Sequence, residues 1–587
     1  MNRKIRYTDI VFLDLFLTAL LLMTIGAMFF VWSPYRLEFK EQIGIFFLGA
    51  GRMAWYLSNP ALLASIAGDW LTQFYNNAWM ASVLSLMILV ALLAGLALFH
   101  RIARPMRPFS LILLMIPVAI EGFFIPYPFY PVSSTVGLLV SVWAAYALAH
   151  ISGRRLLPVV YCMSVPVMFV LVGGHAVTMA LMLAFLKRKD GIAPLLGLVT
   201  GVILMMVCGR LYNLTLLQTF IWPVASNSII PPVWLILAQR LTIPVVLMLS
   251  CRLRPEYPFR TILFRTLVFG SCIILVRNGN DKELESTIKI GSLAYQDNWK
   301  EVKRMAASHE SDMYGPFYWN LCNAREGRLA DELLSGRWGK ASDVLFLSTG
   351  SGDSYFSIVY YIDALLEMGD VSQATDCALL AQTVMPGCYS SRMLRRLAQI
   401  SVVAGDYEVA SKYLDILSRT RNHREWACDL LDCLHSGNIP DQYQRWRSRA
   451  SSHDRFFGQG DTRGALEIIA SDNPSNKTAI DYLLCSYLLD KNVNNFVNQY
   501  DRFYLNSLDR VGPVPEIYQE ALLVNVNSKE SLMETVGKYR ISQNTVDRYM
   551  SLMEARAASD DPNVMPRDLT GTYWNYIMSV KFNKGNR

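Results

Sequence analysis

Long apolar runs separated by short polar segments fill the first half of the chain and stop near residue 276. Because a membrane-spanning helix needs about 20 apolar residues, these runs and their charged flanks predict nine crossings. The predicted spans lie near residues 9–32, 77–99, 109–125, 132–150, 156–172, 175–187, 192–209, 232–251 and 261–276. The pattern therefore predicts an all-α polytopic membrane domain over residues 1–276.

From residue 277 the apolar residues recur in short helical segments that are separated by turns. Four helix starts that we take as equivalent are spaced 39, 33 and 36 residues apart, at Trp299, Trp338, Val371 and Tyr407. These spacings bracket the 34-residue period of tetratricopeptide-type repeats, and "GDYEVASKYL" resembles their inter-helix turn and second helix. Residues 277–587 are predicted to form a tetratricopeptide-like helical-repeat domain, which would either bind a peptide in its groove or act as a rigid spacer.

Positive charge sets the expected orientation of the membrane domain. Fifteen of the twenty Lys and Arg residues in the first 276 positions lie at alternate ends of the apolar runs, in clusters that begin at Arg3, Arg101, Arg154, Lys187 and Arg252. Because positive loops stay in the cytoplasm, the N-terminus is expected inside and the repeat domain outside. The net charges of +12 in the first half and −5 in the second are a topology signal and argue against nucleic-acid binding.

The loop between the first two spans, residues 33–76, is long and rich in aromatic residues. Its apolar stretches are short and break at Asn59-Pro60, as expected for helices that lie in the membrane interface. The six cysteines of the repeat domain show no metal-ligand spacing. We therefore predict no metal site and no certain cofactor, with a divalent cation left open for the membrane half.

Several features of residues 9–276 together resemble the GT-C glycosyltransferase superfamily. They are a first span that runs outward, the long first outer loop, the basic exit "ALFHRIARP" at residues 97–105, and a short helical hairpin centred on Gly173-Gly174-His175. The resemblance implies a polyprenyl-phosphate-linked sugar donor and a catalytic acidic residue in the first outer loop. Here Glu38 and Glu41 occupy that region, and no Asp-x-Asp is present.

The whole chain, including the closing "GTYWNYIM" at residues 571–578, also resembles an uncharacterised family of multi-spanning proteins with repeat tails from Bacteroidetes-type bacteria. This resemblance implies a bacterial inner membrane, so that the outer side predicted for the repeat domain from the charge pattern would be the periplasm.

The outer loop supplies three candidate catalytic residues, Glu38, Glu41 and Asp69. A general base that acts on an acceptor hydroxyl or amide must be a carboxylate or imidazole within hydrogen-bond reach. Glu38 and Glu41 share a helical face if the segment after Pro34 is helical, and the alternative is that they are solvated charges that balance Arg36 and Lys40. For Asp69 the alternative is a cap on the following helical turn.

Five further residues are candidates for substrate binding: Glu121, Tyr127, His175, Arg210 and Arg240. Glu121 precedes the aromatic, proline-stiffened "GFFIPYPFYP", which contains Tyr127 and suits a sugar; the alternative is an ordinary helix-end residue. The three cationic residues could offset the charge of a donor pyrophosphate. Arg240 lies inside an apolar run, where a guanidinium either snorkels to the interface, pairs with another group or binds an anion.

Two functional hypotheses follow from these residues. The first is a GT-C-like transferase that passes a sugar or oligosaccharide from a polyprenyl-linked donor to an envelope protein or peptide held by the repeat domain. The second is a non-enzymatic assembly factor. Its helical membrane domain, which contacts membrane lipid, would anchor the protein and display the repeat domain to envelope proteins.

Overall fold

Every regular element in the described part of this computed structural model is a helix. The structure describes residues 7–103, 110–151, 157–186, 192–211, 213–252, 258–308, 313–336, 339–350, 353–451, 461–505, 513–526, 528–559 and 564–580. The chain forms two compact units. The first contains residues 1–289 together with 382–394 and 415–427, and the second contains 290–381, 395–414 and 428–587.

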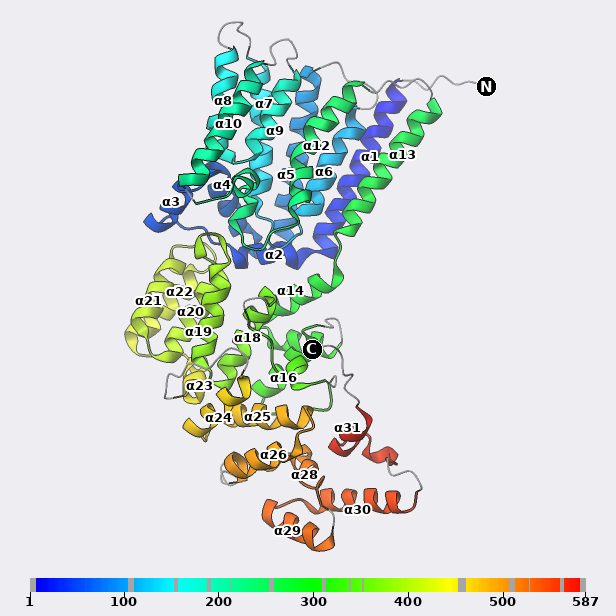
Figure 1. The fold of residues 1–587 in the computed structure, drawn as a ribbon, viewed down its shortest axis with the longest axis vertical. Coiled ribbons are helices and arrows are strands. Elements are labelled where there is room, and N and C mark those ends of the chain that lie inside the picture. The colour runs from blue at the N-terminus through cyan, green and yellow to red at the C-terminus, as the bar shows by residue number, and fades with distance from the viewer. Residues whose placement is uncertain are drawn as a thin grey trace. The chain divides into compact units, whose positions relative to one another are not determined.

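The first unit is a bundle of long helices that lie side by side (Figure 1). Its helices are α1 (Tyr7–Ala27, continued by the π-helical turn Met28–Trp32), α2 (Pro34–Ile43), α3 (Ala50–Leu57), α4 (Leu62–Thr72), α5 (Ala78–Ala103), α6 (Ser110–Phe124), α7 (Val132–Ala149), α8 (Leu157–Val172), α9 (His175–Leu186), α10 (Ile192–Leu211), α11 (Leu216–Ile221), α12 (Val233–Arg252) and α13 (Pro258–Asn278). Among them α8 packs on α10, α4 and α5 on α7, and α6 on α12 and α13.

Each of the nine predicted spans coincides with a helix of this bundle. Within the described residues, four stretches are long and apolar enough to cross a membrane alone: Phe12–Trp32, Ala78–Ile102, Val132–Ala149 and Val233–Ser250. Ile262–Asn278 and Lys282–Tyr295, which are bent by 41°, make a fifth if they count as one span. The other four predicted spans appear as shorter apolar helices, so nine crossings stay a prediction. Most of the positive clusters fall outside the described residues.

The outer loop 33–76 folds into short helices, as its pattern predicts. The segment after Pro34 forms α2, which crosses one end of the bundle in Figure 1, and the break at Asn59-Pro60 separates α3 from α4. α4 packs closely on the first turn of α7, since a Cβ at Gly68 would lie 2.5 Å from the Ser133 backbone nitrogen. The loop is therefore a structured cap on this end of the bundle.

The predicted hairpin turn between α8 and α9 is held against the segment that follows α11. Gly173 has a left-handed φ of 66°, and the Gly174 amide donates to the Trp222 carbonyl at 3.2 Å. A Cβ on Gly174 would overlap the carbonyl oxygen of Phe220 and lie 2.9 Å from Nη1 of Arg240. The two glycines are thus required by close backbone packing.

We expect Gly174→Ala to destabilise the folded protein by about 1–3 kcal/mol or more, because the backbone of Phe220 cannot move aside like a flexible side chain. Gly270→Ala is the matched control, since it lies in α13 with no atom within 4 Å of the added Cβ and should be neutral or stabilising by up to about 1 kcal/mol. The measurement is the melting temperature of the full-length protein in detergent. Equal melting temperatures for the two variants would contradict the packing described here.

The remaining helices are α14 (Lys282–Tyr295), α15 (Trp299–Ala307), α16 (Gly315–Arg325), α17 (Ala341–Val344), α18 (Tyr355–Met368), α19 (Val371–Thr383), α20 (Ser391–Ala404), α21 (Tyr407–Ser418), α22 (Arg424–Ser436), α23 (Asp441–Arg449), α24 (Thr462–Asp472), α25 (Lys477–Leu489), α26 (Val493–Gln499), α28 (Glu516–Leu522), α29 (Lys529–Tyr539), α30 (Gln543–Ala557) and α31 (Tyr573–Ser579). Figure 1 follows them from green to red.

Several of these helices form pairs at the turns that the sequence predicts. Three of the four proposed repeat starts, Trp299, Val371 and Tyr407, are the first residues of helices, and Trp338 lies outside the described residues. Gly369 and Gly405 end α18 and α20 in the left-handed conformation, which glycine adopts without a Cβ penalty. Helical hairpins are therefore present, and their likeness to tetratricopeptide repeats stays a prediction.

Candidate functional site

Glu121 is the centre of a buried hydrogen-bond network at the end of the bundle that α2 crosses. Its side chain is fully buried near the end of α6 and accepts from the Tyr130 hydroxyl at 3.0 Å, the Thr135 hydroxyl at 2.6 Å and the Gln239 amide. Tyr130 ends the proline-rich loop and Thr135 lies in the first turn of α7. A buried carboxylate is stable only with such partners, so Glu121 is more than an ordinary helix-end residue.

The network continues from Tyr130 to His175 through a serine. The Tyr130 hydroxyl oxygen, whose single proton is donated to Glu121, lies 3.0 Å from Ser134 Oγ, and Ser134 Oγ lies 3.0 Å from His175 Nε2. His175 is the first residue of α9 and is fully buried. We call Glu121, Tyr130, Ser134, Thr135, His175 and Gln239 the polar cluster. The structure thus brings two predicted binding residues, Glu121 and His175, into one network.

Lys40 of α2 lies beside the polar cluster and contacts the proline-rich loop that precedes α7. Its ammonium donates to the carbonyls of Tyr127 and Tyr130, the former at 3.0 Å. Burial lowers the pKa of Lys40 from 10.5 to about 7, and the charge of Glu121 offsets part of this shift. Lys40 is therefore a buried group held by backbone carbonyls, and it is not a solvated charge that balances the glutamates of α2.

Arg240 follows Gln239 in α12 and is 1% exposed. Its Nη2 donates to the Trp222 carbonyl at 3.2 Å, and its guanidinium lies 5.5 Å from the centre of the Phe220 ring. In the part of the chain that the structure describes, Nε and Nη1 have no hydrogen-bond partner, and no carboxylate lies within ion-pair distance. The full burial excludes snorkelling, and it leaves a desolvated cation with two free donors.

Asp69 lies inside α4, so the alternative that it caps the following turn is wrong. One carboxylate oxygen, Oδ2, accepts from Nη2 of Arg52 and from the Tyr56 hydroxyl, both at 2.6 Å. Burial opposes the charge on Arg52, but the Asp69 carboxylate outweighs it and raises the pKa of Arg52. Two donors thus fix Asp69 through one oxygen, while its side chain keeps 22% exposure. These two contacts fix the orientation of the Asp69 carboxylate.

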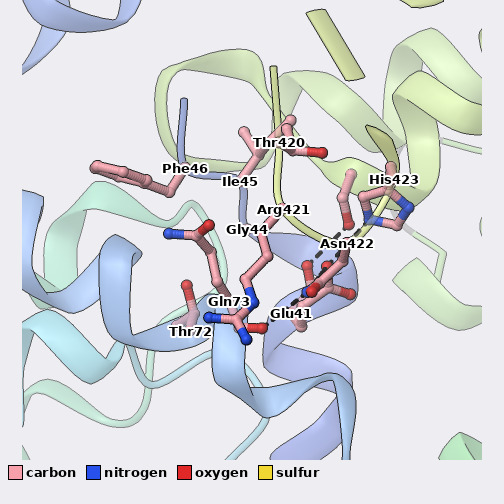
Figure 2. A pocket seen from close by; sticks show the side chains of 11 residues that line it. Glu41, Gly44, Ile45, Phe46, Thr72, Gln73, Thr420, Arg421, Asn422 and His423 are labelled. Carbon is pink, nitrogen blue, oxygen red and sulfur yellow. Dashed lines mark hydrogen bonds and ion pairs between the residues drawn. The ribbon is translucent and has the colours of Figure 1, made fainter. Parts of the chain in front are cut away.

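The glutamates of α2 are both largely buried. Glu38 is 7% exposed. Glu41 accepts from the Asn422 amide at 3.1 Å and lies 3.0 Å from His423 Nε2. Figure 2 shows these side chains around a cavity of about 10 Å³, the space that one water molecule needs. Glu41 is therefore occupied with the segment 415–427 and has no room for a sugar beside it.

The other candidates lie apart from the polar cluster or touch it through backbone. Arg210 is exposed in the last turn of α10, and Tyr127 contributes its carbonyl to Lys40. Among the described residues, no three His, Cys, Asp or Glu side chains could hold a metal ion together. The structure therefore does not bring all eight candidates to one place.

Sequence reasoning overlooked the uncharged members of the polar cluster and the partner of Asp69. Gln239 stands beside Arg240 in an apolar run, where a buried amide needs a partner. Two adjacent polar residues in an apolar run could therefore have indicated from the sequence that Gln239 has a buried partner. No comparable signal marks Ser134 or Thr135, because short hydroxyl side chains also occur in ordinary membrane helices.

A known protein family matches almost the whole chain. A family described as "Family of unknown function (DUF6057)" matches residues 10–579. The chain belongs to this family. The match covers residues of both units, so the family model includes the apolar helical bundle as well as the helices that follow it. No curated protein and no solved structure is significantly similar to the chain.

Proposed function

We propose that this DUF6057 protein is a GT-C-like transferase of the bacterial inner membrane. It would transfer a sugar or oligosaccharide from a polyprenyl-phosphate-linked donor, on the outer face, to an envelope protein held by its helical tail. The observation that carries the proposal is Arg240, a buried guanidinium with two donors left free. A desolvated, planar cation of this kind is suited to bidentate recognition of a phosphate.

Asp69 is the best candidate for the general base among the three outer-loop carboxylates. Arg52 and Tyr56 hold its Oδ2, which leaves the other oxygen to accept a proton. Its helix also reaches the polar cluster, because Gly68 packs on Ser133, the residue before Ser134. In this proposal Asp69 activates the acceptor, and Arg240 offsets the charge of the donor phosphate.

Contacts of the outer loop support the proposed orientation of the tail. Ser390 donates to the Gln42 carbonyl at 2.8 Å, and Nη1 of Arg52 donates to the Pro386 carbonyl at 2.9 Å. The outer loop and segment 382–394, which belongs to the first unit, touch and must therefore lie on the same side of a membrane. Eight of the predicted spans, the described helices α5 to α10, α12 and α13, separate the two segments, and eight crossings, an even number, would satisfy this condition. With the N-terminus inside, both would be periplasmic.

The same contacts favour the second candidate, a non-enzymatic scaffold. Glu41, Gln42 and Arg52 use their polar groups to hold segments 382–394 and 415–427. In a scaffold, the loop would serve only to fix the displayed tail. The two candidates differ in whether Asp69 and Arg240 are needed for any chemistry.

The deciding experiment is a glycan analysis of a deletion strain of the native host. We expect loss or truncation of a glycan on envelope proteins, and restoration by the wild-type gene. The control is complementation with the Gly270→Ala variant, which adds a methyl group in open space. An unchanged profile of protein-linked and lipid-linked glycans in the deletion strain would exclude the transferase and favour the scaffold.

A further inference from the structure

A pocket of about 330 Å³ lies in the second unit, where α26, α28 and α29 meet. Figure 1 shows these three helices in orange. The volume falls at the lower end of the range for ligand sites, about 300–1,000 Å³. The pocket belongs to the helical tail alone, so its role does not depend on the chemistry proposed for the membrane half.

The polar side chains that line the pocket are all uncharged. Asn494 and Asn498 stand four residues apart on α26, and Ser531, Thr535 and Tyr539 stand at the same spacing on α29. Asn525 lies between the two helices, and its amide donates to Asn494 Oδ1 at 3.3 Å. Asn494 and Asn498 are exposed. A ligand here would therefore meet amides and hydroxyls and no formal charge.

The spacing of these groups matches one polymer in particular. Four residues of α-helix rise about 6 Å, and an extended polypeptide repeats every two residues, or about 6.6–6.8 Å. Each asparagine amide offers both a donor and an acceptor, and each residue of an extended chain presents its own N–H and C=O to the same side. Two asparagines one turn apart can therefore pair with the N–H and C=O of alternate residues that face the same side of an extended chain.

We propose that this pocket binds an extended, uncharged peptide segment through its backbone. Asn494 and Asn498 pair with the N–H and C=O of alternate residues, and the hydroxyls of Ser531 and Thr535 bind backbone groups on the opposite side. Val497, Leu522 and Val526 supply the apolar part of the lining and accept a small aliphatic side chain. The favoured partner is an extended segment of another protein that alternates small polar with small apolar residues.

The test uses the full-length protein in detergent and fluorescent, capped octapeptides that alternate threonine with valine or serine with alanine. Binding is followed by fluorescence anisotropy. We expect saturable binding that Asn494→Ala and Asn498→Ala each weaken about tenfold, which corresponds to the loss of two hydrogen bonds. Asn495→Ala is the matched control, because Asn495 is an exposed asparagine of the same helix outside the pocket lining.

Four outcomes would overturn the proposal. One is the absence of saturable binding, and another is equal binding of peptides whose backbone amides are all N-methylated, since these lack the required donors. The third is competition by maltotriose or chitotriose, which would assign the pocket to a glycan. An equal loss in Asn495→Ala and Asn498→Ala would likewise remove the role of the paired asparagines.

Discussion

Replacing Asp69 by Asn should lower the rate of sugar transfer by at least about a hundredfold, within the usual range for loss of a general base. The amide keeps the size of the side chain but cannot accept the proton of an acceptor. Tyr56→Phe removes one of the two donors to Oδ2 and should cost far less, since Arg52 still orients the carboxylate. The measurement is single-turnover transfer from a polyprenyl-phosphate-linked sugar in proteoliposomes.

Asp14→Asn is the matched control for this prediction. Asp14 also pairs with an arginine at 2.6 Å, Nε of Arg265, and both side chains are buried. It lies about 20 Å along α1 from the end of that helix, at 1.5 Å per residue, and therefore away from the outer loop. We expect Asp14→Asn to lower the melting temperature but to leave the rate per folded molecule unchanged.

Two further variants locate the base within the outer loop. Glu38→Gln and Glu41→Gln should leave the rate within a few-fold of wild type, because Glu41 is occupied by His423 and Asn422. A hundredfold loss at either glutamate, with Asp69→Asn fully active, would move the base to α2. Full activity of all three variants would exclude an outer-loop base.

Most of the helices of the first unit could be predicted because the sequence signals that define them lie within or next to each helix. A run of apolar residues interrupted by a positive cluster or a proline defines a helix without reference to the rest of the chain. The hairpin at Gly173-Gly174 followed from the charge pattern alone, and the structure adds the reason for the glycines. Local signals gave the repeat turns as well, since Gly369 and Gly405 end their helices in a conformation typical of glycine.

The partners of the candidate residues could not be predicted, because they come from distant parts of the chain. Glu41 and His423 are separated by 382 positions, and Gln42 and Ser390 by 348. No period or charge pattern links such residues. The same holds for Lys40, whose acceptors are backbone carbonyls that carry no sequence signature.

Only some members of the polar cluster were predicted from the sequence. The members that were missed determine how the role of Glu121 is interpreted. Glu121 stood out because it precedes the aromatic, proline-stiffened loop, and His175 because it could supply positive charge at the turn of the hairpin. Gln239 and Tyr130 join them into one network, in which Glu121 accepts three hydrogen bonds. With its carboxylate used in this way, Glu121 supports the site, and the charged group with free donors is Arg240, while Nε1 of Trp222 and Nδ1 of His175 also have no partner among the described residues.

If Arg240 is the phosphate ligand, replacing it should raise the stability of the protein and weaken its binding of the donor phosphate. Replacement of an unpaired buried charge by an apolar residue removes a desolvation cost, so Arg240→Met should raise the melting temperature of the protein without donor. The same change should weaken binding of a polyprenyl phosphate by roughly 2–5 kcal/mol, the effect of removing one partner of a buried charge pair. Arg240→Lys should restore binding only in part, because an ammonium lacks the planar fork.

Arg210→Ala is the control for binding, since Arg210 is exposed at the end of α10 and should change affinity by no more than about fivefold, the upper limit for a surface charge. Affinity is measured by tryptophan fluorescence during titration with polyprenyl phosphate vesicles, and stability by thermal unfolding of the same samples. A lower melting temperature with unchanged affinity in Arg240→Met would show that the guanidinium stabilises the fold. The donor phosphate would then need another cation, and the transferase proposal would lose the observation on which it stands.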